Sequence, residues 1–505
     1  MKVIAMYLPQ FHHVKENDEW WGKDFTDWTT VKNAKPLYQG HDQPKAPLDQ
    51  YYYDLTDKRT MEWQVRLMER FLVDGMCIYH YWFKDGKKIL EKPAENLLDW
   101  KDIRMPFCFC WANETWARSW SNVKDKNVWA DTFEQSGRKN GSGILLEQRY
   151  GEEEQWEEHY DYLLPFFKDS RYIRVDGKPL LVIYRASGIP CLREMLALWR
   201  KRAVEDGLAG LYVIGIWVKE TDRGVVDAVL FHEPVRARFA LSGRSPDGLL
   251  RLSYDALWDN ILKAQGKGKT FFGGFSSYDD TPRRGKSGCL AEGAAPDKFA
   301  RYLTELMAKN EACGNDMVFL NAWNEWGEGM CLEPDSRNRF GYLEAIPYAK
   351  ERYRERVSFY REKQKERRCM DEETQRLEEE REKMAHYLNL MDAWMGLREK
   401  GIRLDAWLSG RGYQTIGIYG YGILGKHLVK ELEGSRVRIG YIADRDRGKL
   451  PAWIPAFSPD EQIPETDILV VAATFYYDEI CRQLKEKGIK KIVSLKRLIE
   501  EAEEG

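Results

Sequence analysis

Two glutamates three positions apart, Glu325 and Glu328, are the residues of this sequence best suited to acid–base chemistry. They lie in the segment 324–329, which follows an apolar run, so a tight turn after a strand would direct both carboxyl groups into one cavity. Cleavage of a glycosidic bond needs two carboxyl groups with different roles, one protonated and one ionised. The flanking Trp323 and Trp326 would reduce the solvation of the pair and separate its pKa values. An exposed turn with two solvated glutamates is the alternative interpretation.

A scaffold of parallel strands is expected to hold this turn. Continuous apolar runs, which indicate strands covered on both faces, recur along the first part of the chain. The runs are 3–8, 76–82, 106–111, 179–184, 211–216, 227–231, 270–275 and 317–322. Helical segments such as 60–74, 192–206 and 296–310 separate several of them. We therefore predict the α/β class and a TIM-like (β/α)8 barrel, with an open doubly wound sheet as the alternative.

Polar and aromatic side chains follow most of these runs directly. In a (β/α)8 barrel the active site forms at the C-terminal ends of the strands, and aromatic faces beside hydrogen-bonding groups suit sugar rings. The residues predicted to bind a sugar are Tyr7, Gln10, His12, Trp21, His80, Tyr81, Trp111, Asn113, Glu114, Tyr184, His232, Glu233, Trp323, Asn324 and Trp326. Ordinary packing at a strand end is the competing interpretation, and for Glu114 it is an ion pair with Arg118.

The composition excludes several classes of protein. A net charge of -3 with no concentrated basic stretch argues against nucleic-acid binding. No apolar run approaches the length of a membrane span, and the chain starts directly with a strand rather than a secretory signal. The 9 Cys are scattered and odd in number, as expected for reduced thiols, so we predict a cytoplasmic protein. The 8 His show no recurring ligand spacing, and we predict no metal site.

The chain is predicted to contain three parts: a barrel over 1–347, a helical connector over 348–411 and a small Rossmann-like domain over 412–505. The connector is densely charged. Its apolar residues Met370, Leu377, Met384 and Met391 recur at heptad spacing. Because the second apolar position of each heptad is incomplete, a solvated helix is favoured over a coiled coil.

A glycine-rich loop opens the last predicted domain. Gly420, Gly422 and Gly425 lie between a predicted strand and a helix, and Asp444 ends the next strand. Such glycines allow a phosphate to approach a helix N-terminus, and an acidic residue there can bind a ribose hydroxyl. We predict either a nucleotide or nucleotide-sugar site or an organising domain without a ligand. The barrel itself is expected to need no cofactor.

Several motifs, taken together, resemble the WbsX-like proteins related to glycoside hydrolase family 99. The motifs occupy 7–12, 17–23, 25–28, 40–41, 110–116, 171–173, 177–179, 280–284, 323–329 and 333–334. The resemblance covers roughly residues 1–348. It implies a (β/α)8 barrel that acts on glycans, often encoded with genes for bacterial cell-surface polysaccharides.

The resemblance also implies roles for the glutamates. Characterised family 99 enzymes are retaining endo-α-1,2-mannosidases with an Asn-Glu-Trp-x-Glu motif. The first glutamate deprotonates the sugar 2-hydroxyl, which attacks the anomeric carbon to give a 1,2-anhydro intermediate. The second protonates the leaving group and then activates water. Carried over by motif, Glu325 would be the base and Glu328 the acid/base. This sequence has Gly327 where the hydrolases commonly have His, a difference that bears on the substrate and on hydrolysis itself.

Three functions are therefore considered. The first is a retaining, endo-acting, α-mannosidase-like glycoside hydrolase of bacterial cell-surface polysaccharide metabolism. The second is a WbsX-type glycosyltransferase in polysaccharide or O-antigen biosynthesis, which would require a nucleotide sugar. The third is a non-catalytic carbohydrate-binding scaffold. The expected partners are an oligo- or polysaccharide and other polysaccharide-assembly enzymes.

Overall fold

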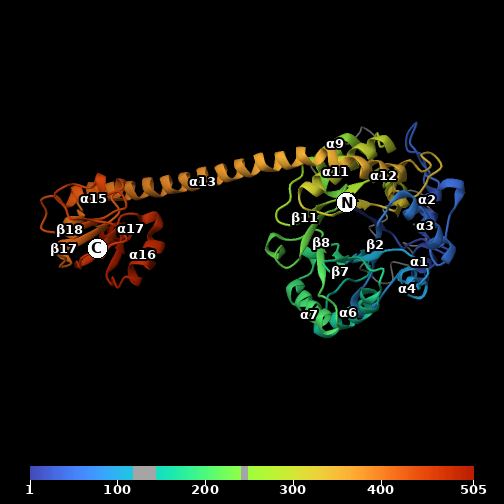
Figure 1. Ribbon diagram of the computed structural model, residues 1–505, viewed down its shortest axis with the longest axis horizontal. Helices are drawn as coiled ribbons and strands as arrows, with labels where there is room; N and C mark the ends of the chain where they lie inside the picture. The colour runs from blue at the N-terminus through green and yellow to red at the C-terminus, as the bar shows by residue number, and fades with distance from the viewer. Residues whose placement is uncertain (118–143, 240, 242–247, 505) are drawn as a thin grey trace. The chain divides into compact units, whose positions relative to one another are not determined.

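The computed structural model describes residues 1–117, 144–239, 241 and 248–504. They form two compact units, Met1–Gln364 and Lys365–Gly505 (Figure 1). The long helix α13 (Val357–Glu399) contains the boundary between them.

The first unit is built on a parallel sheet that closes into a barrel. Its strands are β1 (Lys2–Tyr7), β2 (Gly75–His80), β3 (Phe107–Trp111), β7 (Lys178–Ile183), β8 (Tyr212–Gly215), β9 (Ala228–Phe231), β11 (Thr270–Phe272), β12 (Gly274–Phe275) and β14 (Met317–Asn321). They are ordered β11-β9-β8-β7-β3-β2-β1-β14-β12, and β1 places Val3 opposite Val318 and Ala5 opposite Met76. β11 and β12 are separated only by Gly273, and they pair with β9 and β14 respectively. The two edges therefore belong to one kinked strand, which confirms the predicted (β/α)8-type barrel and excludes an open sheet.

Gly273 is the position at which this strand changes partner. A Cβ atom there would lie 2.6 Å from the carbonyl oxygen of Phe231 and 3.2 Å from that of Phe319. Backbone from both neighbouring strands thus approaches the same point, and only glycine leaves enough room.

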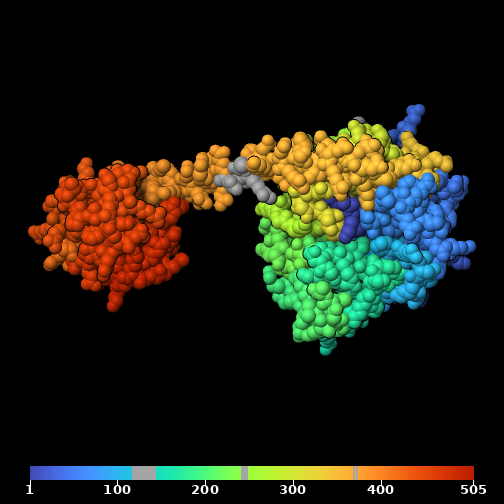
Figure 2. Space-filling model, viewed as in Figure 1, coloured from blue at the N-terminus to red at the C-terminus, as the bar shows by residue number. Residues whose placement is uncertain are grey.

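Helices cover the outside of the barrel (Figure 1), and the space-filling view shows the surface that their side chains form together with the loops (Figure 2). They are α3 (Lys58–Phe71), α4 (Lys92–Asp99), α6 (Glu153–Lys168), α7 (Leu192–Glu205), α9 (Tyr254–Lys263), α11 (Pro296–Ala312) and α12 (Gly341–Arg352). The connection from β8 to β9 has a 3-10 turn, η5 (Glu220–Asp222), in place of a helix. α3 shows how the sequence directs this packing, since it buries Met61, Val65 and Met68 and begins where the Asp57 side chain accepts from the Arg59 amide.

Shorter elements lie in the connections. The helices are α1 (Lys15–Trp21), α2 (Asp27–Asn33), α8 (Val235–Arg238) and α10 (Thr281–Arg284). The strands are β4 (Trp116–Ala117), β5 (Ile144–Leu146), β6 (Arg174–Val175), β10 (Leu250–Ser253), β13 (Cys289–Glu292), β15 (Asn324–Glu325) and β16 (Met330–Cys331).

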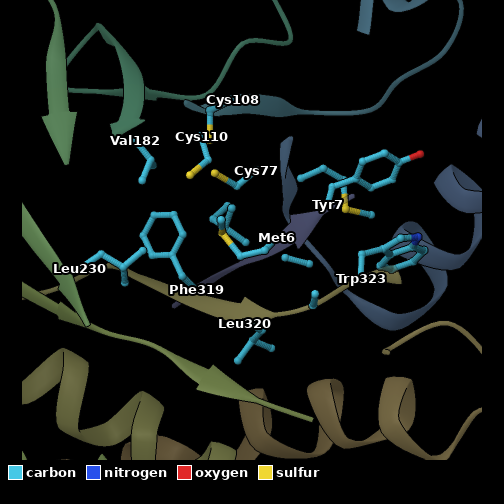
Figure 3. Close-up of a cluster of buried hydrophobic side chains, with 14 of the residues drawn as sticks. Met6, Tyr7, Cys77, Cys108, Cys110, Val182, Leu230, Phe319, Leu320 and Trp323 are labelled. Carbon is cyan, nitrogen blue, oxygen red and sulfur yellow. The ribbon is translucent and has the colours of Figure 1, made fainter. Parts of the chain in front are cut away.

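Side chains fill the centre of the barrel, so it is a packed core. Met6, Cys77, Cys110 and Phe319 gather between the strands in Figure 3, and all are buried. Successive residues of a strand point to opposite faces. Leu320, next to Phe319, accordingly points toward the outer helices in the same view.

The second unit is a small α/β domain. Its strands are β17 (Thr415–Tyr419), β18 (Arg438–Ala443), β19 (Ala456–Phe457), β20 (Ile468–Val471) and β21 (Ile492–Ser494). All pairings are parallel, in the order β19-β18-β17-β20-β21, which is the Rossmann-like order for the elements present. The hydrophobic cores on the sheet include residues of α14 (Leu404–Gly410), α15 (Ile423–Leu432), α16 (Tyr477–Glu486) and α17 (Leu495–Glu504).

The charged helix α13 contributes its last turns to this second core. Leu390, Trp394 and Leu397 are buried there. By contrast, Met370 and Leu377, two of the heptad residues, are 67% and 54% exposed.

Among the described residues, none of the helices combines the length and the apolar character that a bilayer span requires.

Gly273→Ala should destabilise the barrel, because the new methyl group meets backbone oxygens that cannot move without opening the sheet. Overpacking of this kind costs about 1–3 kcal/mol. Urea unfolding followed by tryptophan fluorescence measures the change. Gly224→Ala is the matched control, since a Cβ atom there meets nothing within 4 Å. Equal stability of the two variants would contradict the proposed reason for glycine at 273.

Candidate active site

The two glutamates lie on one tight turn after the last barrel strand. Glu325 ends β15, and Glu328 ends the 3-10 turn η7 (Trp326–Glu328). Gly329, with φ of 63°, returns the chain into β16, which pairs antiparallel with β15. The Glu325 side chain is 8% exposed and that of Glu328 is 30% exposed. One glutamate is thus buried and the other can be reached from solvent.

Arg283 joins the two glutamates across this turn. Its Nη2 donates to Glu325 Oε1 at 2.6 Å, and its Nη1 donates to Glu328 Oε1 at 2.8 Å. Nη2 also donates to Asp27 Oδ2 at 3.2 Å. Asp27 begins α2 and Arg283 belongs to α10, so three segments far apart in sequence meet at one guanidinium. Charge-assisted hydrogen bonds from a planar fork fix the direction of both glutamate carboxyl groups.

Gly327 provides the room for this arrangement. A Cβ atom at 327 would lie 2.7 Å from Arg283 Nε and 2.9 Å from Asp27 Oδ2. Any side chain at this position would therefore push the guanidinium or the aspartate away. The glycine that distinguishes this motif from the hydrolase pattern is explained by the ion cluster that covers it.

Burial controls the protonation of the pair. It raises the pKa of Glu325 to about 8; the Arg283 guanidinium opposes this shift, and the charges of Glu328 and Asp27 add to it. The surrounding carboxylates, acting against burial, hold the pKa of Arg283 well above its ordinary value, so it stays charged. Near neutral pH Glu325 is therefore mainly protonated.

A second buried carboxylate, Glu333, supports the turn from below. Its Oε1 accepts from Trp323 Nε1 and Gln64 Nε2, both at 2.8 Å. Its Oε2 accepts from Trp326 Nε1 at 2.8 Å and from Tyr53 OH at 2.7 Å. Burial raises the pKa of Glu333 to about 7 although these donors oppose the shift. Glu333 thereby fixes the tryptophans on either side of Glu325.

Four of the residues predicted to bind sugar belong to this support. Trp323 and Trp326 are fully buried with their indole N–H groups on Glu333. Tyr7, also fully buried, donates to Gln64 Oε1 at 2.9 Å. Asn324 exchanges two hydrogen bonds with the Leu8 backbone at 2.8 and 2.9 Å, which attaches the turn to the end of β1. These contacts give the four residues a positioning role, and contact with a sugar remains a prediction.

His80 and Trp111 lie on the outer face of their strands. His80 Nε2 is 2.8 Å from His159 Nε2 of α6, and burial lowers the pKa of His80 to about 3. Trp111 donates from Nε1 to the Trp82 carbonyl oxygen at 3.1 Å and packs edge-on against His159. The structure places these two between the barrel and α6, away from the glutamate pair.

Tyr81 and Tyr184 do lie near the pair, together with two tyrosines that were not predicted. Burial raises the pKa of Tyr81, and the nearby Glu325 charge adds to it. Burial and carboxylate charges, including those of Glu328 and Glu325, act on Tyr184 in the same way. Desolvation raises the pKa of half-buried Tyr79 and of buried Tyr278; the charge of Glu325 adds to the shift of Tyr79, and that of Glu328 to the shift of Tyr278. These four rings are the aromatic surroundings of the pair.

The remaining predicted residues of the first strand ends are spread around this region. Gln10 forms a side-chain hydrogen bond with Tyr81. His12 is buried, which lowers its pKa to about 4. Trp21 is half-buried and lies 6.0 Å from Phe25, measured between ring centroids.

Asn113 and Glu114 contact the loop after β7. The Asn113 amide donates to Tyr150 OH at 2.9 Å and to the Arg185 carbonyl oxygen at 3.0 Å. Glu114 Oε1 accepts from Arg185 Nη1 at 2.9 Å. The alternative partner considered for Glu114, Arg118, lies outside the described residues.

His232 and Glu233 differ in their surroundings. His232 Nε2 is 3.2 Å from Tyr79 OH, so this histidine adjoins the tyrosines, and burial lowers its pKa to about 4. Glu233 accepts from Arg236 Nε at 2.5 Å and from the Ala237 amide at 2.8 Å, which fixes the start of α8. Burial raises the pKa of Glu233 to about 7.

Sequence reasoning missed Arg283, Asp27 and Glu333 as site residues. All three stand in the motifs at 25–28, 280–284 and 333–334 that carried the family resemblance. The motifs were thus a signal for them, although no spacing rule indicates that an arginine 42 residues before Glu325 contacts it.

The glycine loop of the second unit has the local structure that was predicted. Gly420 has φ of 92°, and a Cβ atom on Gly425 would lie 2.1 Å from the Gly420 carbonyl oxygen. Gly422 precedes the first residue of α15. The Asp444 carboxylate accepts from the Tyr421 amide at 2.6 Å. A nucleotide ligand at this loop stays a prediction.

Over the part of the chain that the structure describes, no group of three or more His, Cys, Asp or Glu could hold a metal ion.

The first unit of the protein is a closed (β/α)8-type barrel whose last strand leads into a turn with paired glutamates. A family model described as Glycosyltransferase WbsX matches residues 3–346. Two proteins called WxcX, from strains of Xanthomonas campestris pv. campestris, are each 32% identical over 364 residues, which is 69% of this chain and 49% of theirs. The chain therefore belongs to the WbsX glycosyltransferase family, and its match spans about half the length of these relatives.

Solved structures of similar fold were also found. The GH99 endo-alpha-mannosidase from Bacteroides thetaiotaomicron has a TM-score of 0.42 and 15% identity, covering 70% of this chain and 98% of its own. A glycoside hydrolase-like protein has a TM-score of 0.42 and 15% identity, covering 69% and 93%. At these scores the likeness carries no argument about activity, and the barrel is established by its own strand order.

Glu333→Gln should destabilise the barrel unit. One oxygen of the carboxylate becomes an amide NH2, which cannot accept, so a tryptophan or tyrosine donor is left unpaired. Each unpaired buried donor costs about 1–3 kcal/mol. Urea unfolding measures the loss, and Glu344→Gln on the exposed face of α12 is the control. A stability equal to that of the control would show that the carboxylate does not hold the turn.

Proposed function

We propose that the chain is a glycan-active enzyme of polysaccharide metabolism whose reaction takes place at Glu325 and Glu328, with retaining glycoside hydrolysis as the leading candidate. The single observation that carries this proposal is the arrangement of the pair: two carboxyl groups on one turn, one buried and one accessible, joined by Arg283. Split roles for two carboxyl groups are what glycosidic cleavage requires. The surrounding tyrosines provide the aromatic faces that suit sugar rings.

The roles follow the difference in exposure. Glu328, the accessible member, protonates the leaving glycosidic oxygen and then takes a proton from water. In the first step Glu325, the buried member, takes the proton of the sugar hydroxyl beside the anomeric carbon; that oxygen bonds to the anomeric carbon and the glycosidic bond breaks. In the second step water, which loses its proton to Glu328, attacks the anomeric carbon; the bond to the neighbouring oxygen breaks and Glu325 returns the proton to that oxygen. Burial keeps Glu325 protonated at rest, so the reactive state has this proton on Glu328 instead. Since Arg283 donates to both carboxyl groups, it can stabilise either distribution.

Glycosyl transfer from a nucleotide sugar is the second candidate. Two observations favour it: the description of the matching family model, and the glycine loop of the second unit with Asp444 beside it. A transferase lengthens an acceptor only when the donor is present, whereas a hydrolase shortens a glycan with water alone. The third candidate, a carbohydrate-binding scaffold, predicts glycan binding without turnover.

The test incubates the purified full chain with bacterial glycan oligosaccharides, with and without nucleotide sugars, and identifies products by mass. We expect shortening that does not depend on a nucleotide. Glu325→Gln and Glu328→Gln should each lower the rate by about 10²–10⁴-fold, the usual contribution of a general acid or base. Glu344→Gln should retain it. Lengthening that requires a donor would replace hydrolysis with transfer, and glycan binding without any product would favour the scaffold.

The pH dependence of kcat/KM gives a further prediction. The reaction needs one proton on the pair, and the last proton leaves as the pH rises past the pKa of about 8 of Glu325. Activity should therefore fall on the alkaline side with a midpoint near pH 8. A rate that keeps rising above pH 9 would be inconsistent with a shared proton, because that is about one unit past the midpoint.

A further inference from the structure

We propose that Arg283 is the positioning residue of the site: its guanidinium fixes the two glutamate carboxyl groups relative to each other and stabilises whichever of them carries the negative charge. The catalytic part of this inference rests on the proposed function, whereas the geometric part does not. Arg283 donates one Nη to each glutamate, at 2.8 Å to Glu328 and 2.6 Å to Glu325.

Arg283 is held in place independently of the glutamates. The residue before its helix, Asp280, accepts from the Cys289 amide at 2.5 Å and from Tyr278 OH at 3.0 Å. Asp279 accepts from the backbone and the hydroxyl of Thr281 at 3.0 and 2.6 Å. All of these carboxylates are buried. The short helix α10 is thus held at its start by contacts of Asp279 and Asp280.

The same clamp connects α10 to the glutamate turn. His41 and Gln43 hold the other oxygen of Asp279, at 2.8 and 2.7 Å. The Asp279 amide donates to the Glu328 carbonyl oxygen at 2.8 Å. Backbone and guanidinium contacts from one segment therefore both reach the turn. This double attachment indicates positioning rather than an incidental surface ion pair.

The planar fork of an arginine is essential to this role. Two separate Nη groups can each serve one carboxyl group, whereas a lysine offers a single ammonium centre that cannot span the pair in the same way. Gly327 lies directly beneath the guanidinium, and even a methyl group there would come within 2.7 Å of Nε. The position of the Arg283 guanidinium therefore depends on the absence of a side chain at Gly327.

The charges around Arg283 explain what it does chemically. Among the described residues, three carboxylates contact this one guanidinium, those of Asp27, Glu325 and Glu328. Their charges exceed that of the arginine, which favours a proton on the pair. The arginine limits this effect, because its charge lowers the pKa of Glu325. Without it, a buried Glu325 would face two like charges with no compensation, and burial already raises its pKa to about 8.

The experiment titrates the carboxyl carbons of the full chain by NMR, with 13C-labelled glutamate and the Glu325→Gln variant for assignment. No substrate is needed. In Arg283→Gln, we expect the titration of Glu325 to move upward by about 1 to 3 pH units, the usual effect of one charge at this distance. Arg301→Gln, on the exposed face of α11, should leave the Glu325 titration unchanged. An unchanged Glu325 titration in Arg283→Gln would overturn the proposal.

Two further variants separate charge from geometry. Arg283→Lys keeps the charge and removes the fork, so we expect a smaller shift of the Glu325 titration than in Arg283→Gln. Gly327→Ala keeps the arginine and displaces it, which should also raise the midpoint. Gly327→Ala therefore tests the proposal even where Arg283→Gln does not fold. An unchanged midpoint in a folded Gly327→Ala variant would count against the fixed position of Arg283.

Activity measurements connect the positioning role to the reaction. On a glycan that the wild type cleaves, Arg283→Lys should lower kcat by roughly 10²-fold, the effect of misplaced catalytic groups, with little change in KM. A fall in affinity alone would show that Arg283 merely binds substrate. The two proposals fail separately: a shifted titration with no glycan turned over refutes the function, whereas turnover with an unshifted titration refutes the role of Arg283.

Discussion

The ion cluster around Arg283 is the interaction on which the site depends. Burying charges costs free energy unless they are paired and hydrogen-bonded, and a lone partner left behind is strongly unfavourable. Here Asp27, Glu325 and Glu328 reach one guanidinium, and the Asp27 and Glu325 side chains are 5% and 8% exposed. The three carboxylates come from the connection after β1 and from the turn after β14, while the arginine follows β12. They meet only because the barrel brings these strands together.

Barrel closure therefore brings together the residues of the proposed site. β1, β14 and β12 are adjacent in the sheet, and Gly273 lets one strand bridge from β9 to β14. Below the ion cluster, Glu333 fixes the tryptophans of the glutamate turn, and Asn324 attaches that turn to β1. These hydrogen bonds hold the turn that carries Glu325 and Glu328. The carboxylate that supports the turn and the two carboxyl groups of the proposed reaction thus lie in one loop.

Much of the fold could be predicted from the sequence because both faces of each barrel strand are covered. Continuous apolar runs at 76–82, 179–184 and 317–322 correspond to β2, β7 and β14 with small differences at their ends. The run at 270–275 was expected as one strand, and the structure divides it at Gly273. The glycine loop after β17 was also recognisable, since its spacing is local.

The directions of the side chains could not be predicted as well. His80 and Tyr81 are neighbours in sequence, yet one packs against α6 and the other lies beside Glu325. A position at the end of a strand does not by itself decide whether a side chain faces the inside of the barrel or the outer helices, because successive residues of a strand point to opposite faces. The partnership of Arg283 with the glutamates depends on tertiary structure, and only the motifs around it gave a signal.

The most direct test of the central claim is a crystal structure of the Glu328→Gln variant with a bound glycan oligosaccharide. The account predicts a glycosidic oxygen next to residue 328 and a ring hydroxyl next to Glu325, with Arg283 still donating to Glu325. Tyr81 and Tyr184 should contact the sugar. A glycan bound elsewhere on the chain, with the glutamate pair untouched, would contradict the assignment of the reaction to this turn.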